Sequence, residues 1–288
     1  MLNWKEVLDW KFPEVTQAYS ERDAILYALG LGYGQDPTHE DELRYVHEEH
    51  AQGLRVVPSL AVVLGGPGAW MRDPRTGIDW VRSLHGEQGL VMHAPLPASA
   101  TVIGRNRVVD IVDKGPGKGA LLMLERDIVD AATGQLIATR TATSFLRGDG
   151  GCGAPGVARA RPEPVPSRSP DATVEITTRP ETALIYRLSG DYNPVHASPA
   201  VARKAGFERP ILHGLCTFGI ACRALIQGAC GGDPGRLVRM NGRFSASVYP
   251  GETQTVDIWN EGGGQVRFRT RVRDRDVVAL DFGEAQVR

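Results

Sequence analysis

The stretch HGLCTFGIACRALIQ, residues 213–227, decides the fold of the second half of this sequence. Leu215, Phe218 and Cys222 recur at helical spacing, and Arg223 is the only charged residue, so the stretch predicts a helix that is apolar nearly all round. Because many of its residues are small, other elements can pack closely against it. The sequence therefore predicts a helix buried at the centre of its own unit.

Four strand-like runs follow this helix and are separated by turns rich in glycine, proline and aspartate. In the third run, apolar residues alternate with arginines at a strict period of two, which is typical of a strand with one buried and one solvent-facing side. A buried helix followed by antiparallel strands predicts an α+β unit in which a sheet curls around one helix. The four runs are Gly242–Tyr249, Thr253–Asn260, Gln265–Arg273 and Val277–Phe282.

The first half of the chain repeats this pattern in a weaker form. Ala24–Leu29 resembles Ala183–Leu188 at an offset of 159 positions, and a polar stretch, Gln35–Gln52, replaces most of the helical region. We therefore expect two similar units in tandem. The strands expected in the first unit are Ala100–Val112, Gly119–Val129 and Gln135–Leu146.

The boundary between the units is predicted from composition. Residues 148–170 are rich in glycine, proline, serine and arginine and lack apolar periodicity, as is typical of a linker. We expect a first unit over residues 1–150, a linker over 151–170 and a second unit over 171–288.

Composition and charge exclude several classes of protein. The formal net charge is −1, so the chain has no basic excess for binding nucleic acid. No apolar run is long enough to span a membrane, and the first residues lack the apolar core of a signal peptide. The four cysteines show no CxxC spacing, which favours a reducing compartment. We therefore expect a cytoplasmic protein without nucleic-acid or membrane partners.

The densest polar cluster is SGDYNPVH, residues 189–196. Pro194 biases the preceding residue toward extended backbone, so the cluster is expected to form a loop in which Asp191 and His196 converge. A carboxylate and an imidazole side by side can hold and deprotonate a water molecule, and Asn193 is placed to orient one of them.

His213 and Gly214 begin the buried helix. Unpaired backbone N–H groups and the positive end of the helix favour a developing oxyanion there, and Gly214 allows a ligand to approach the backbone closely. For His213 two interpretations stay open, a capping or core histidine and a catalytic one.

The run Tyr186–His196, followed by His213-Gly214, resembles the signature of the MaoC-like, hydratase 2 type (R)-specific enoyl-CoA hydratases. The first half is similar to the degenerate N-terminal repeat of the two-repeat hydratases, on segments that lie between Tyr27 and Pro97: Tyr27–Gly30, Pro58-Ser59 and Pro95–Pro97. The resemblance therefore covers nearly the whole chain.

The resemblance implies an α+β double hot-dog fold whose second repeat is catalytic and whose first repeat accommodates the acyl chain. It implies that Asp191 and His196 are the catalytic pair, that Asn193 and Gly214 contact the substrate, and that Gly214 N–H binds the thioester oxygen. The implied reaction is reversible hydration of a trans-2-enoyl-CoA to an (R)-3-hydroxyacyl-CoA, as in fatty acid β-oxidation. The implied partners are an acyl-CoA substrate and a second copy in a homodimer, with no metal or redox cofactor.

Alternative interpretations stay open at three places. The chain could be a hot-dog acyl-CoA thioesterase or a non-catalytic acyl-CoA binding protein. The arginines of Gln265–Arg273 and Arg243 could contact coenzyme A phosphates or line a solvated sheet face. His47 and His50 are three positions apart, whereas the zinc motif HExxH places its histidines four apart, so a solvated polar face is the favoured interpretation.

Overall fold

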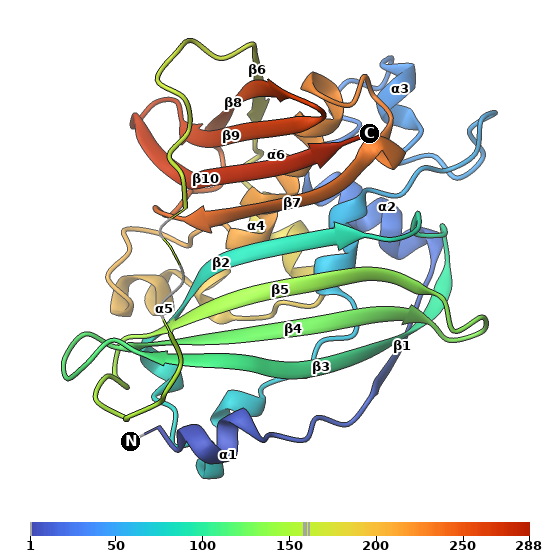
Figure 1. The fold of residues 1–288 in the computed structure, drawn as a ribbon. Coiled ribbons are helices and arrows are strands. Elements are labelled where there is room, and N and C mark those ends of the chain that lie inside the picture. The colour runs from blue at the N-terminus through green and yellow to red at the C-terminus, as the bar shows by residue number, and fades with distance from the viewer. Residues whose placement is uncertain (1, 158–159, 161) are drawn as a thin grey trace.

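The computed structural model describes residues 2–157, 160 and 162–288. They form one antiparallel sheet of ten strands in the order β1-β3-β4-β5-β2-β7-β10-β9-β8-β6 (Figure 1). The first five strands of the chain make one half of the sheet and the last five make the other. The two halves join where β2 pairs with β7, so that side chains of both halves share one inward face. The strands are β1 (Val15–Tyr19), β2 (Ser83–Met92), β3 (Ala100–Asp113), β4 (Ala120–Asp130), β5 (Leu136–Leu146), β6 (Ala172–Thr177), β7 (Leu237–Phe244), β8 (Thr253–Gly262), β9 (Gln265–Val272) and β10 (Val277–Val287).

The predicted central helix is α6 (Gly214–Gly228), and it is buried as expected. Every residue from Cys216 to Ile226 is buried, and the helix packs against strands of its own half, which wrap around it (Figure 1). Its small residues allow this close packing: a Cβ atom added at Gly228 would lie 2.7 Å from a terminal methyl of Ile258 on β8.

The first half has no long helix in the corresponding place. Its inward face is covered by α2 (Glu21–Gly30), the short α3 (Glu40–Leu43) and the 3-10 turn η1 (Pro58–Val63), while α1 (Trp4–Leu8) packs on β3. The polar stretch predicted here consists mostly of turns around α3. A buried ion pair joins it to the second half, because Arg223 of α6 donates to Glu42 of α3.

Two expected strands are wrong in their bounds. The run Gly242–Tyr249 was expected as a strand, but β7 begins at Leu237 and ends at Phe244. The pairing with β2 and β10 decides this, because the ladder runs from Leu237 and the chain turns away after Phe244 toward Pro250. Strand β10 also continues beyond the expected Val277–Phe282, to Val287. The other expected strands agree with the structure within about two residues.

The segment between the two halves contains no helix or strand among its described residues in the range 151–170. Residues 158, 159 and 161 of the expected linker lie outside the described part of the chain. Hydrogen bonds hold the beginning of this segment against the end of β3. The carboxylate of Asp113 accepts them from the amides of Gly151 and Gly153 at 2.8 and 2.7 Å. Among the helices that the structure describes, none has the length and apolar character needed to cross a membrane.

Candidate functional site

The polar cluster of the second half forms a stiff loop. Helix α4 (Thr182–Tyr186) runs into a 3-10 turn, and Gly190 then reverses the chain with a φ of 117°, which side chains other than glycine rarely adopt. Pro194 opens a second 3-10 turn, in which the side-chain oxygen of Asn193 accepts a hydrogen bond from the amide of Val195 at 3.2 Å. Local hydrogen bonds and proline geometry therefore fix where the side chains of this loop point.

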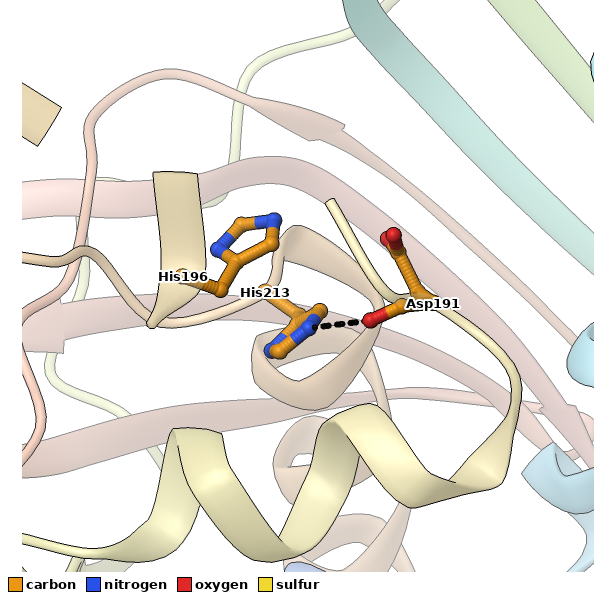
Figure 2. A group of neighbouring side chains, drawn as sticks. All are labelled: Asp191, His196 and His213. Atoms are coloured by element: carbon orange, nitrogen blue, oxygen red, sulfur yellow. Dashed lines mark hydrogen bonds between the residues drawn. The ribbon is translucent and has the colours of Figure 1, made fainter. Parts of the chain in front are cut away.

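The loop meets the first turn of α6 at a cluster of three side chains, Asp191, His196 and His213 (Figure 2). One donor atom from each lies within 4.8 Å of the others, and the two imidazole rings stack with centroids 3.7 Å apart. This spacing suits groups that share one small ligand, because two hydrogen bonds of about 2.8 Å can bridge such a distance through a single water molecule. The same atoms are also close enough together to hold a metal ion.

The hydrogen bonding of His196 fixes its tautomer. Its Nδ1 lies 2.8 Å from the carbonyl oxygen of Ile211, and a carbonyl can only accept, so Nδ1 carries the proton. The lone pair is then on Nε2. Burial lowers the pKa of His196 below its ordinary value of 6.5, so the neutral ring predominates at neutral pH. The side chain is therefore prepared to accept a proton.

His213 contacts both other members of the cluster. Its Nε2–H donates to the backbone oxygen of Asp191 at 3.1 Å, the dashed line in Figure 2, while its Nδ1 is buried without a hydrogen-bond partner in the structure. Burial, assisted by the neighbouring His196, lowers the pKa of His213 to about 4. The sequence left two interpretations open, and the structure places this residue both at the helix start and in contact with His196.

Gly214 is the first residue of α6, and its amide is available for a ligand. The first helical hydrogen bond is made by the amide of Cys216, which donates to the oxygen of His213 at 3.0 Å. A Cβ atom at Gly214 would lie 3.3 Å from the ring of Phe244, so a side chain would crowd this end of the helix. An N–H group at the positive end of a fifteen-residue helix is a favourable place for a negative oxygen.

The structure thus places all four residues that the sequence singled out around one point, in different ways. Asp191 and His196 belong to the cluster, and Gly214 directly follows its third member, His213. Asn193 is exposed and contributes its backbone amide, which donates to a carboxylate oxygen of Asp191 at 3.1 Å. Its side chain is used within the turn.

Residues of the first half also approach the cluster, and the sequence analysis missed them. His85 on β2 lies edge-on to Phe244 with ring centroids 4.9 Å apart, and Arg140 on β5 lies near Tyr186. These residues reach the cluster only because β2 pairs with β7. The one signal in the sequence is that polar residues occupy strand positions whose side chains turn inward.

The arginines considered for coenzyme A phosphates are engaged elsewhere. The arginines of β9 pair with carboxylates on the adjacent strands β8 and β10, and Arg273, which follows β9, pairs with Glu175 on β6. Arg243 pairs with Glu87 at 2.7 Å. These arginines form ion-pair rows on the outer face of the sheet. The pairs are Arg267–Glu284, Arg269–Asp281, Arg271–Asp257 and Arg273–Glu175.

A groove of about 590 Å³ lies on the outer face of the sheet, where Ala160 and Pro162 border it together with Met123 and Phe282. None of the three cluster residues lines this groove.

Of the histidines in the polar stretch, His50 approaches Glu40 at 3.5 Å. Neither feature is continuous with the cluster.

Two known protein families match separate parts of the chain. Residues 17–148 match the MFE-2 hydratase 2 N-terminal domain, and residues 162–281 match the MaoC like domain.

Three similar proteins cover nearly the whole chain. Enoyl-CoA hydratase 2, peroxisomal, from Arabidopsis thaliana is 39% identical over 287 residues, which is 95% of this chain and 92% of that protein. The 3-hydroxyacyl-thioester dehydratase Y of Mycobacterium tuberculosis is 41% identical, covering 93% of this chain and 92% of that protein. The crystal structure of a MaoC-like dehydratase from Phytophthora capsici superposes with a TM-score of 0.88 at 34% identity and covers 100% of this chain and 99% of that one.

The expected α+β double hot-dog fold is confirmed. A Mycobacterium tuberculosis protein whose solved structure is described as a double hotdog fold superposes with a TM-score of 0.56 at 18% identity, over 97% of this chain and 94% of that one. The plant relative is peroxisomal by name, and the cytoplasmic location and homodimer expected for this chain stay predictions.

Proposed function

The chain belongs to the MaoC-like, hydratase 2 family, and we propose that it catalyses the reversible addition of water to a trans-2-enoyl-CoA at the cluster of Asp191, His196 and His213. As such it is a hydro-lyase with an acyl-CoA substrate, and its product is an (R)-3-hydroxyacyl-CoA. The observation that carries the proposal is the convergence of one carboxylate and two neutral imidazoles within 4.8 Å at the start of a buried helix.

The water molecule is held between Asp191 and His196. Nε2 of His196 carries the lone pair, so it takes a proton from the water as the oxygen attacks C3 of the enoyl group. Asp191 accepts a hydrogen bond from the second O–H of the water and helps to guide the proton that His196 has taken to C2, so one O–H bond of water breaks, and C3–O and C2–H bonds form. At the end of the cycle the imidazole is neutral again.

Negative charge develops on the thioester oxygen as C3 is attacked. The amide of Gly214 at the N-terminus of α6 is positioned to donate a hydrogen bond to that oxygen. Loss of such a donor typically costs about 10²- to 10³-fold in kcat. His213 does not touch the substrate in this scheme; it positions Asp191 and His196 through its hydrogen bond and its stacked ring.

The two halves have different roles in this scheme. The second half, residues 171–288, supplies the catalytic loop and α6. The first half, residues 1–150, lacks an equivalent of α6, so its inward face accommodates the acyl chain, with residues 151–170 as the connection.

The proposal is tested by following the absorbance of the conjugated enoyl thioester together with thiol release, with chiral analysis of the product. Hydration consumes the absorbance without releasing thiol and gives the (R) product. His196→Gln is expected to lower kcat by about 10²- to 10⁴-fold, and Asp191→Asn by a similar factor. Release of thiol would instead identify a thioesterase, and full activity in both variants would contradict the assigned roles.

A further inference from the structure

Two arginines on the inward face of the first half have no carboxylate partner. Arg126 on β4 and Arg140 on β5 are directly opposite each other in the sheet, so their side chains lie on the same face. In the part of the chain that the structure describes, neither forms an ion pair. Burial lowers the pKa of both guanidinium groups, and the charge of Arg140 lowers the pKa of Arg126 further. Two neighbouring cations without a counter-charge are unusual inside a protein.

The corresponding inward face in the second half, on β9, carries no charged residue. The inward residues of β9 are buried and mostly apolar: Val266, Phe268, Thr270 and Val272. They lie in the half that α6 fills, whereas the arginines lie in the half that has no such helix. The charge is therefore placed on the face that we assign to the acyl chain.

The two arginines differ in how they are satisfied. Arg126 is only 5% exposed and donates to Asn106 at 2.8 Å and to the backbone oxygen of Leu64 at 2.6 Å, so it ties β4 to the end of η1. Arg140 is half-buried and uses only its Nε, which donates to Gln88 at 3.2 Å. Its two terminal amino groups donate to no described protein atom. The side chain therefore offers a charge and unused N–H donors.

Tyr186 and His85 link Arg140 to the catalytic cluster. On one side Tyr186 is close enough for its hydroxyl to influence Arg140, and its ring centroid is 5.1 Å from that of His213. On the other side, the charges of Arg140 and Asp191 both act on the pKa of buried His85: Arg140 lowers it and Asp191 raises it. Among the described residues, none lies within hydrogen-bonding geometry of the buried hydroxyl of Tyr186, so a second polar group in the same place is unsatisfied.

We propose that Arg140 binds a carboxylate carried by the acyl chain, so that the preferred substrates are enoyl-CoA thioesters with an anionic group on the acyl part. A guanidinium matches a carboxylate with two parallel hydrogen bonds, and the anion would neutralise one of the two buried cations. The inference rests on the proposed hydratase function and adds to it the class of acyl group.

The test compares three trans-2-enoyl-CoA thioesters of matched length whose chains end in a methyl group, a hydroxyl or a carboxylate. The native enzyme is expected to show a kcat/KM about ten- to a hundredfold higher for the carboxylate than for the methyl compound. Arg140→Met is expected to abolish this preference, which is measured as the ratio of the kcat/KM values for the carboxylate and the methyl compound, and Arg140→Lys retains part of it. The matched control is Arg105→Met, an exposed arginine of β3 that pairs with Glu14, which leaves all three values unchanged.

Three results would overturn the inference. If Arg140→Met lowers kcat/KM equally for all three substrates, the arginine serves coenzyme A or the fold. If the native enzyme prefers the hydroxyl compound to the carboxylate, no anion is recognised. Hydration of the methyl-ended substrate without a carboxylate preference refutes this inference alone, whereas hydration of none refutes the proposed function. Calorimetric binding of the saturated carboxylated acyl-CoA, weakened in Arg140→Met and partly restored in Arg140→Lys, tests the inference independently of turnover.

Discussion

His213→Phe is expected to make the protein less sensitive to acid. The folded protein keeps His213 neutral down to a pKa of about 4, because the side chain is 1% exposed and stacked on His196, whereas the unfolded chain binds the proton near 6.5. As the pH falls from 6.5 to 4, unfolding therefore takes up one proton at this residue and the free energy of unfolding decreases. The slope is about 1.4 kcal/mol per pH unit, so the total is about 3 kcal/mol.

Phenylalanine keeps an aromatic ring on His196 but has no proton to bind, so this contribution to the slope disappears. The measurement is urea denaturation of both proteins at several pH values between 4 and 7, compared as free energies of unfolding. His39→Phe, at an exposed histidine of the first half, is the control and is expected to leave the slope unchanged. Parallel slopes for the native protein and His213→Phe over this interval would refute the reasoning.

Three further predictions concern the site and its support. Because burial lowers the pKa of His196, the acid limb of the kcat/KM profile is expected below pH 6.5, and a limb above that value would contradict the assigned base. Glu42→Ala leaves the charge of buried Arg223 unpaired and is expected to cost about 3 to 5 kcal/mol in urea denaturation, whereas a loss under 1 kcal/mol would show that water replaces the carboxylate. Gly214→Val places a branched side chain against Phe244 and beside the helix amide, so kcat is expected to fall by about 10²-fold in the hydration assay, and native activity would argue against an oxyanion contact.

The sequence predicted the elements whose pattern is local. The apolar stretch over residues 213–227 could only be a buried helix, and α6 is buried from Cys216 to Ile226. The proline and asparagine of the polar loop restrict its backbone, so the approach of Asp191 to His196 follows from short-range geometry. The strands with strong alternation were likewise found within about two residues.

The bounds of β7 and the existence of β2 were not predicted. Both strands lie at the centre of the sheet, where a residue's partner is up to 156 positions away, as in the pair Glu87 and Arg243. Pairing rather than local preference decides how far such a strand extends. For the same reason, the sequence marks His85 and Arg140 only as polar residues at strand positions, and it does not show that they face the site.

The sequence by itself determined the two repeated units, the helix at the centre of the second and the loop that carries Asp191 and His196. Only the tertiary structure decided that β2 joins β7, and with it that His85 of the first half packs on Phe244 and Arg140 lies near Tyr186, the two residues that border Gly214 and His213. The physical reason is range: turn chemistry and periodicity act over a few residues, whereas the neighbours of an inward side chain are set by strand pairing across the whole chain.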